Sequence, residues 1–231
     1  MRRFAGLELN DGAIPDETTI LEFRRLLEQH GLAQRMLEVV NVHLADKSPL
    51  LRQGTIIHAP SSTKNADKAR DPAMRQTKKG NQRYFSMKAY IGADVESGLV
   101  HTVTVTPANE ANVTQTEKLL HGREKSVHAD AGYIGADKRS EKRGRRWSIA
   151  AKRGTVVKLP EGELKAATKE FESLKAAIRA KAAPPFRVIK RQFGYVKVRY
   201  RGLAKNAAQV QALFVLSNLW MARKRLLGMT G

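Results

Sequence analysis

The first fifty residues carry apolar side chains at the spacing of an α-helix. The apolar positions recur every three to four residues from Ile20, stop at His30-Gly31 and resume after it. Thr19 and Glu22 stand three residues apart, as in a capping box at a helix start. The pattern predicts two helices over residues 16–48. A helix-turn-helix is open, but the polar positions form no recognition face, so packing is the favoured role.

Short apolar or alternating runs, separated by turn residues, follow and predict strands. The run Asp94 to Gly98 predicts a hairpin turn, and Pro184-Pro185 bends or breaks a long helical zone. The expected strands are 50–59, 84–93, 99–106, 126–132 (ending in a turn) and 147–152; the expected helices are 112–120, 134–145, 164–191 and 206–227; residues 60–83 are expected to form a long basic loop. Strands that alternate with helices predict an α/β fold, a mixed sheet flanked by helices with an N-terminal helical segment.

The charge of the chain indicates a polyanionic partner. The 231 residues include 42 Lys and Arg against 22 Asp and Glu, a net charge of +20. Residues 138–205 hold 21 basic and 5 acidic residues, or +16 of that total. A chain this basic usually binds nucleic acid. The alternative is a solvated face that aids solubility, but sixteen excess positive charges in one segment repel one another.

Membrane and redox signals are weak. The most apolar stretch, 210–222, is too short to span a bilayer and contains Gln211, Ser217 and Asn218. No signal peptide is visible, and the chain has no cysteine, which fits a reducing cytosol. We therefore expect a cytoplasmic protein with no membrane partner and no small-molecule substrate.

Two segments mix basic residues with aromatic or glycine residues. Residues 186–205 hold seven basic and no acidic residues, and 196–201 alternate apolar with basic positions, so an extended chain would place three cations on one face. In 64–83, Lys78-Lys79-Gly80 would let the backbone approach a phosphate. Both segments are typical of backbone positioning rather than base reading. The alternative for the first is an edge strand kept soluble by charge. The predicted DNA-binding residues are Lys64, Lys78, Lys79, Arg179, Arg187, Lys190, Arg191, Lys197, Arg199 and Arg201.

Asp130 is the candidate for metal-dependent chemistry. It follows an apolar strand and precedes a glycine-containing turn, and catalytic groups of α/β sheets gather at such strand ends. A carboxylate there is a suitable ligand for Mg²⁺, which prefers hard oxygen atoms and is often held by one or two carboxylates plus substrate phosphates. The alternative is an aspartate that caps the helix expected near Ile134. Local sequence leaves both open.

Several runs along nearly the whole chain resemble the bacterial DDE transposases of the insertion sequence 5 family. The runs are Ile57-His58-Ala59-Pro60-Ser61-Ser62-Thr63-Lys64-Asn65, Thr77-Lys78-Lys79-Gly80-Asn81-Gln82-Arg83-Tyr84-Phe85, His128-Ala129-Asp130-Ala131-Gly132-Tyr133 and Pro185-Phe186-Arg187-Val188-Ile189-Lys190. The resemblance implies an RNase H-like fold and a triad of two Asp and one Glu. It also implies two Mg²⁺ ions and double-stranded DNA, at element ends and target, as the substrate. Asp130 matches the second Asp of that triad.

The other two carboxylates of the implied triad have no match. The family pattern Gly-Thr-x-x-Asp-Ala-Thr precedes Ile-Ile-His-Ala-Pro, whereas Gly54-Thr55 runs directly into Ile56 here. In the pattern Arg-x-x-x-Glu-x-x-x-x-x-x-Lys, Arg179 and Lys190 keep their spacing but Ala183 stands at the Glu position. We expect an internal deletion and, because residues 1–7 resemble an internal segment of longer relatives, an N-terminal truncation. Glu172 lies roughly 16 Å along the helix from Ala183, too far to substitute simply.

These observations predict two parts, residues 1–49 as a remnant of a longer helical region and 50–231 as the DDE catalytic domain. The resemblance implies that the chain is a transposase, which carries out DNA cleavage and strand transfer. Its missing acids predict weak Mg²⁺ binding and impaired activity, so whether it is an enzyme is left open. The alternatives are a non-catalytic DNA-binding protein, such as a repressor or an inhibitor of an intact transposase, and a pseudogene product. A homodimer is also open.

Overall fold

The computed structural model describes residues 16–41, 49–58, 71–79, 81–122, 124–141 and 144–228, with the backbone alone for 40, 41, 49–58, 79 and 225–228. The helices are α1 (Glu17–Gln29), α2 (Leu32–Asn41), α3 (Thr116–Leu119), α4 (Ala136–Arg139), α5 (Arg153–Val157), α6 (Glu163–Ala180), α7 (Pro184–Arg191) and α8 (Leu203–Gly228), with 3-10 turns η2 (Asn112–Gln115) and η3 (Ala131–Tyr133). The strands are β1 (Pro49–His58), β2 (Arg75–Lys79), β3 (Gln82–Asp94), β4 (Val100–Pro107), β5 (Ser126–Ala129) and β6 (Arg146–Ile149).

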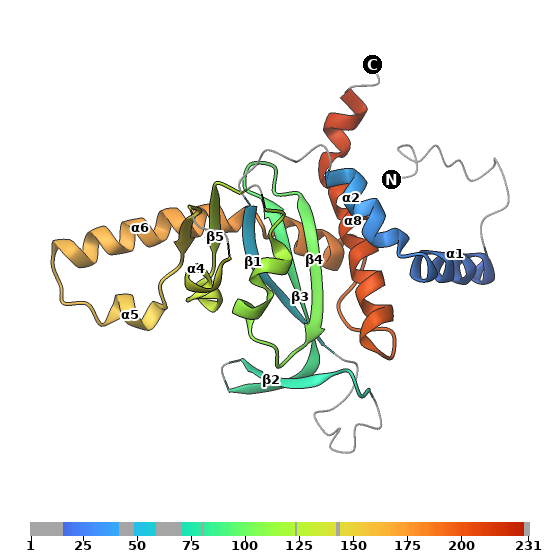
Figure 1. Ribbon diagram of the computed structural model, residues 1–231, viewed down its shortest axis with the longest axis horizontal. Coiled ribbons are helices and arrows are strands. Elements are labelled where there is room, and N and C mark those ends of the chain that lie inside the picture. Colours follow the sequence, from blue (N-terminus) through green and yellow to red (C-terminus); the bar gives the residue numbers. More distant parts are fainter. Residues whose placement is uncertain are drawn as a thin grey trace.

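The strands form one mixed sheet of six (Figure 1). β1 pairs antiparallel with β3 on one edge and parallel with β5 on the other, and β6 continues parallel beyond β5. β2 and β4 pair antiparallel with successive parts of β3, β2 with Gln82 to Ser86 and β4 with Met87 to Ala93. The predicted α/β class, a mixed sheet flanked by helices, is confirmed.

The central strand β1 carries an irregularity. Gln53 pairs with Tyr90 and the next pair is Ile56 with Lys88, so Gly54 and Thr55 lie opposite the single intervening residue of β3. Two residues opposite one is the arrangement of a β-bulge, which bends a strand and increases its twist. β1 nevertheless remains paired with β3 on both sides of the bulge.

The alternation of side chains along the strands builds two separate cores. On one face, Ala89 and Ile91 of β3 pack with α7 and α8, where the rings of Phe186 and Phe214 meet edge to face with centroids 5.1 Å apart. On the other face, Tyr90 packs with β5 and with the short helices α3 and α4 and the turn η3. Helices therefore cover both faces of the sheet, and the turn after β5 lies in the second core.

The N-terminal helical hairpin forms as expected but starts differently. Asp16, rather than Thr19, caps α1, with its Oδ1 accepting the Thr19 backbone N–H at 2.7 Å. Glu22 pairs with Arg25 at 2.8 Å instead of returning to the helix start. The predicted capping box is therefore wrong. In such a box the Glu22 side chain would accept the Thr19 backbone N–H, but Asp16 accepts that N–H instead.

The second N-terminal helix belongs to the main core. Leu37 of α2 is fully buried in the cluster that contains β3, α7 and α8. Gln211 of α8 donates from Nε2 to Gln34 Oε1 at 3.0 Å. The packing role favoured for the hairpin is thus observed for α2, whereas α1 buries none of its residues completely.

Three further expectations need correction. Residues 75–79, predicted as part of a loop, form strand β2, because they find a partner in the start of β3. Residues 60–70 of the same expected loop lie outside the described residues. The helix expected over 134–145 is only the single turn α4, and α8 begins three residues earlier than predicted. Among the described helices, none has the length and apolar character needed to cross a membrane.

A buried asparagine ties the last helix to the sheet. Asn218 of α8 accepts the Val100 backbone N–H at 2.9 Å and donates to the Val100 carbonyl at 2.7 Å, and both residues are buried. The turn that leads into Val100 is the predicted hairpin, which Gly98 closes with a φ of +70°. The side-chain amide therefore acts as one rung of the sheet and positions α8 against β4.

Replacing Asn218 with alanine is expected to destabilise the fold. The change leaves the buried N–H and carbonyl of Val100 without this partner, and each unsatisfied group costs about 1–3 kcal/mol. We expect a loss of roughly 2–4 kcal/mol in the free energy of unfolding, measured by urea denaturation. Leu216→Ala, at a 37% exposed site on the same helix, is the control and should cost less than half as much. Equal losses for the two variants would contradict the bridging role.

Candidate active site and nucleic-acid interface

Asp130 lies where the parallel strand β5 ends. It is the N-terminal cap of η3, and its Oδ1 accepts the Gly132 backbone N–H at 2.9 Å. The capping alternative is therefore part of the structure, although Asp130 caps the 3-10 turn and not the helix after Ile134, which is α4. The N-cap residue of α4 is Gly135, which provides no side-chain cap. One carboxylate oxygen is engaged in this turn, and the residue is partly exposed.

Tight packing holds the Asp130 turn in place. A Cβ on Gly132 would approach Asn112 Nδ2 to 2.2 Å and Asp130 Oδ1 to 3.0 Å, so only glycine fits there. Tyr133 is fully buried in the core behind the turn, and burial, then the nearby negative charge of Asp130, raises the pKa of its hydroxyl. Asn112 thus lies beside the Asp130 turn, a contact that sequence pattern does not predict because eighteen residues separate Asn112 from Asp130.

A second carboxylate reaches the same edge of the sheet. Glu172 of α6 accepts the Ala151 backbone N–H, just beyond β6, at 3.1 Å. Lys175 pairs with Glu172 at 2.7 Å and also donates to the Ile149 carbonyl at 3.0 Å. Glu172 therefore fixes α6 to the end of β6, and its charge is balanced by Lys175.

The described side chains do not assemble a metal centre. Within the described ranges, no group of three or more His, Asp or Glu side chains lies close enough to hold a metal ion. The neighbouring strand β1 contains no acidic residue along its whole length. Its Leu51 pairs with Ala129, so Arg52 and Gln53 follow at the level where Asp130 leaves β5. Asp130 alone is a poor fit to a pair of divalent cations, which need several oxygen ligands.

The segment 197–201, predicted to alternate basic and apolar residues, is held by hydrogen bonds to its backbone but does not form a strand. Asn206 donates to the Tyr200 carbonyl at 2.7 Å and to the Gly202 carbonyl at 2.6 Å, and Asp71 accepts the Gly202 N–H at 2.9 Å. Lys197, Arg199 and Arg201 are all exposed, as expected. Val196 and Val198 were expected to share one apolar face, but Val198 is buried whereas Val196 is 62% exposed.

The helix α7 extends this basic surface. It buries Phe186, Val188 and Ile189 and leaves Arg187 and Arg191, four residues apart, exposed. No ion pair with another described residue forms at Arg187, Arg191, Lys197 or Arg199. We call the set Arg187, Arg191, Lys197, Arg199 and Arg201 the basic strip.

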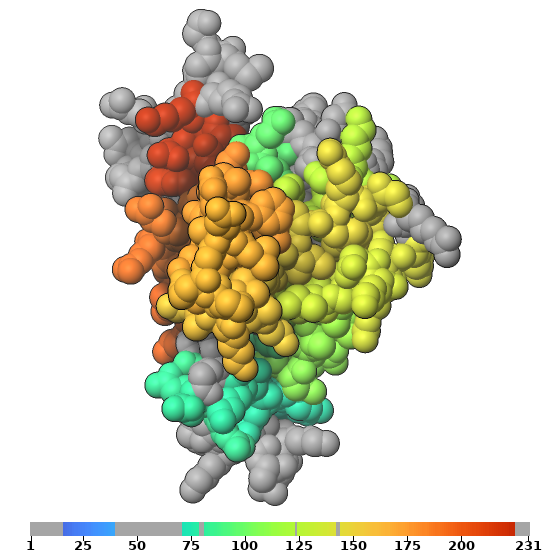
Figure 2. Space-filling view, turned by 90° about the vertical axis from the view of Figure 1, so that its left-hand side faces the viewer, coloured from blue at the N-terminus to red at the C-terminus, as the bar shows by residue number. Residues whose placement is uncertain are grey.

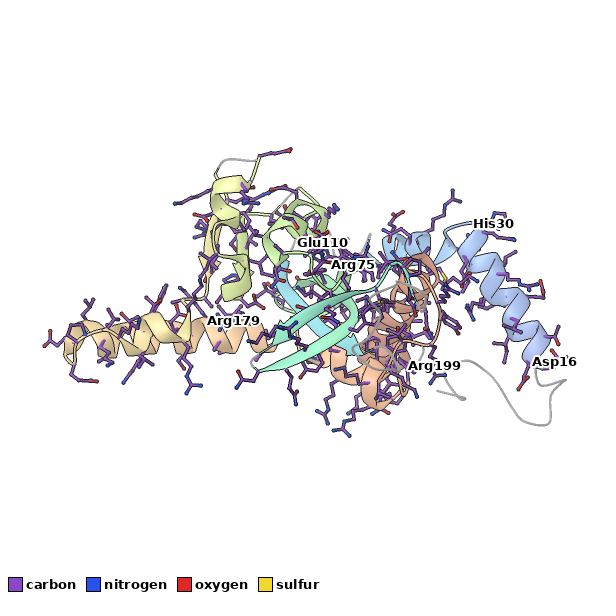
Figure 3. All side chains as sticks on the ribbon, turned by 90° about the horizontal axis from the view of Figure 1, so that it is seen from below. Asp16, His30, Arg75, Glu110, Arg179 and Arg199 are labelled. Carbon is purple, nitrogen blue, oxygen red and sulfur yellow. The ribbon has the colours of Figure 1, made fainter. Side chains whose placement is uncertain are left out.

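The remaining predicted DNA-binding residues lie elsewhere. Lys78 is exposed on β2, the side chain of Lys79 and all of Lys64 fall outside the described residues, and Lys190 is half-buried. Figure 3 shows Arg179, at the C-terminal end of α6, and Arg199 on different sides of the β2–β3 ribbon. Five of the ten predicted cations thus fall within residues 187–201, and all five are exposed.

The family model described as Transposase DDE domain matches residues 50–219, which is most of the chain. No solved structure matches the chain.

A group of titratable side chains lies apart from Asp130, between β4 and the loop after α3. Burial, followed by the neighbouring charge of His121, lowers the pKa of His101 from 6.5 to about 4, against the opposing charges of Glu124 and Asp94. The His101 and His121 rings meet edge to face at 5.1 Å, and Glu124 pairs with the buried Arg145 at 3.2 Å. His101 is therefore neutral in the folded protein at pH 7.

This burial predicts acid sensitivity. The unfolded chain binds a proton at His101 near pH 6.5 but the folded chain only near pH 4, so the free energy of unfolding falls as the pH falls through that window. We expect His101 to contribute a loss of roughly 3 kcal/mol between pH 7 and pH 4, followed by urea denaturation. His101→Phe should remove that part of the pH dependence, and His30→Phe, at an exposed histidine, should not. Parallel pH curves for all three proteins would refute it.

Proposed function

Because the chain belongs to the transposase DDE domain family, we propose that it binds double-stranded DNA as a descendant of the insertion sequence 5 transposases. We further propose that its own DNA cleavage is impaired. The observation that carries this proposal is the contrast between an exposed basic strip and a strand-end site with one available carboxylate. DNA binding and DNA cleavage use different residues in such a protein, so one can persist without the other.

The basic strip supports the binding half of the proposal. Its cations are exposed and lie within residues 187–201, and the buried Asn206 and Asp71 hydrogen-bond the backbone of Tyr200 and Gly202, on either side of Arg201. Exposed cations can each replace a counterion on a phosphate. Because the strip offers backbone contacts and no base-reading helix, we expect binding to element ends and target with little sequence discrimination from these residues.

We also propose the finer family features. An RNase H-like fold is supported by the antiparallel β3–β4 hairpin beside β1, with β5 and β6 parallel on the other edge. The start of the family match at residue 50 supports a division into a helical segment, 1–49, and a catalytic domain, 50–231, to which Leu37 of α2 attaches the first part. The protein would work in the bacterial cytoplasm, on the nucleoid.

The proposed loss of cleavage rests on two positions. In the family pattern the first Asp stands five residues before the His of Ile-Ile-His, and that position in this chain is Gln53. Gln53 directly precedes the bulge in β1, where a deletion would join strand segments of unequal register. The Glu position is Ala183, the cap residue of α7, whose methyl group offers no ligand. Asp130 would be the remaining ligand, and Mg²⁺ binding there would be weak.

Removing charge from the basic strip is expected to weaken DNA binding in a salt-dependent way. The wild-type affinity should fall with salt along a log-log slope near −7, which corresponds to about eight phosphate contacts. Lys197→Ala with Arg199→Ala should reduce that slope by about 2, as measured by fluorescence anisotropy on duplex DNA. Lys169→Ala, at an exposed lysine on α6, is the control and should leave the slope unchanged. Binding that does not weaken between low and moderate salt would end the proposal.

Restoring the two carboxylates is expected to restore metal binding. The wild-type chain should show no cleavage or strand transfer on terminal-repeat DNA with Mg²⁺ or Mn²⁺, since losses of about 10⁴ to 10⁶ follow removal of a catalytic unit. Gln53→Asp combined with Ala183→Glu should gain stabilisation by Mn²⁺, measured as a rise in Tm, because metal that binds only the folded state stabilises it.

The matched control is Gln53→Asn combined with Ala183→Gln, which has the same shape without the charge. It should gain no Mn²⁺ stabilisation. Robust turnover by the wild-type chain would sink the impaired-cleavage proposal, whereas equal Mn²⁺ effects on both double variants would show that the two positions are not metal ligands.

A further inference from the structure

The β2–β3 ribbon, which is strand β2 paired with Gln82 to Ser86 of β3, extends beyond the rest of the sheet (Figure 1). β4 pairs with β3 only from Met87 onward, and the pairs of β1 with β3 begin at Ser86. Among the described strands, none pairs with the outer edge of β2 or with the other edge of residues 82–85. Figure 2 shows part of the ribbon (teal) on the surface below α6. Two strands alone are marginally stable in water, so this ribbon gains from a partner.

The ribbon carries positive charge and no acidic residue. Residues 75–86 include Arg75, Lys78, Lys79 and Arg83, and no Asp or Glu. Lys78 and Arg83 stand directly opposite each other in the strand register, and both side chains are exposed. Like charges at directly opposed positions destabilise a strand pair. A polyanion bound against this pair would offset the repulsion, so the ribbon favours an anionic partner.

The two opposed cations share a face of the sheet with the basic strip. Along β3, Phe85 packs against the main core, and Met87 and Ala89 belong to it. Arg83 precedes Phe85 by two residues, so strand alternation places it on that same face. Lys78, directly opposite Arg83, shares the face. Because α7 and the segment after it bury residues in this same core, the cations of the ribbon and of the basic strip lie on one side of the sheet.

A hydrogen-bonded turn joins the base of the ribbon to the end of the basic strip. One carboxylate oxygen of Asp71 accepts the Ala73 N–H at 3.0 Å, and the other accepts the Gly202 N–H at 2.9 Å. Arg75 donates to two backbone carbonyls of the same turn. A single buried carboxylate therefore fixes the start of β2 beside the residue that follows Arg201.

The dimensions of the ribbon fit the major groove of B-form DNA. β2 has five residues, a rise of about 17 Å, and paired strands lie about 4.8 Å apart. With its side chains, a two-stranded ribbon fits the major groove, which is about 12 Å wide, but not the minor groove, about 6 Å wide. Alternation along β2 places the exposed Gln76 on the same face as Lys78. Lys and Arg donate to guanine edges and Gln pairs with adenine, so this face carries side chains suited to base edges.

We propose that the β2–β3 ribbon enters the major groove of duplex DNA, with Gln76, Lys78 and Arg83 directed at the base edges. The inference rests on the proposed DNA binding and gives the ribbon a task of its own. The basic strip contacts phosphates, whereas the ribbon occupies the groove and supplies discrimination between bases. The shared anchor at Asp71 fixes where the ribbon stands relative to the strip.

A duplex with a filled major groove tests the proposal. An unmodified duplex of mixed sequence is compared with the same duplex carrying glucosylated 5-hydroxymethylcytosine in place of cytosine, in which glucose fills the major groove and the phosphates are unchanged. By fluorescence anisotropy, the wild-type chain should bind the filled duplex at least about tenfold more weakly. Lys78→Ala with Arg83→Ala should bind the unmodified duplex more weakly and should bind the two duplexes within about twofold of each other, because the groove contacts are already lost.

The matched control is Lys138→Ala combined with Arg139→Ala. It also removes one exposed lysine and one exposed arginine, but from α4, whose Ala136 belongs to the core on the opposite face of the sheet. The control should keep the tenfold preference for the unmodified duplex. Loss of that preference in the control would show that it depends on total charge, and would overturn the assignment to the ribbon.

A second variant separates DNA contact from folding of the ribbon. Lys78→Glu places opposite charges across the strand pair, which stabilises it. Its unfolding midpoint in urea should therefore equal or exceed that of the wild type. The new carboxylate faces the DNA, so the affinity for the unmodified duplex should fall at least about tenfold. A well-folded Lys78→Glu chain that binds this duplex as tightly as the wild type would contradict the proposal.

The ribbon inference and the proposed DNA binding fail in different ways. If the wild-type chain binds neither duplex, the DNA-binding proposal is refuted and the ribbon inference falls with it. If it binds both duplexes equally well, with the salt dependence expected of phosphate contacts, DNA binding stands and only the ribbon inference is overturned.

Discussion

Strand β1 pairs along both of its edges, and this double pairing joins an antiparallel half of the sheet to a parallel half. On one side it meets β3, which carries β2 and β4; on the other it meets β5, which carries β6. The bulge at Gly54-Thr55 lets the pairing with β3 resume at Ile56, although β1 has one residue too many for a regular ladder. Because Asp130 follows β5, the strand that fixes the sheet also decides which residues stand beside the candidate site.

Charge divides the surface into regions with different roles. At the C-terminal end of the basic strip, the buried Asp71 and Asn206 hydrogen-bond the backbone of Tyr200 and Gly202, while Arg199 and Arg201 remain exposed. α6 is anchored to the edge of the sheet through the Glu172–Lys175 charge pair, in which Glu172 accepts a backbone N–H just beyond β6. Leu164, Phe171 and Leu174 of the same helix are exposed, whereas Ile178 packs against the main core.

Periodicity predicted most of the elements because helix and strand repeats are local properties of the sequence. Both N-terminal helices, the hairpin around residues 94–98 and the break before Pro184 lie where the pattern placed them. Residues 75–79 were missed because a short basic strand has no apolar repeat and depends on its partner in β3. The helix expected over 134–145 is only one turn long. Of the described residues in that range, only Ala136 belongs to a core cluster, so little packing supports a longer helix.

The sequence by itself determined the charge of +20, the position of Asp130 at a strand end, and the absence of acids from residues 49–58. Those are facts of composition and local order, which no folding can change. Only the tertiary structure decided that Asn112 packs on the Asp130 turn, that Glu172 is bound to the end of β6, and that Phe171 of α6 is exposed. These depend on contacts between distant segments, and the sum of many such contacts sets how a helix is rotated on a sheet.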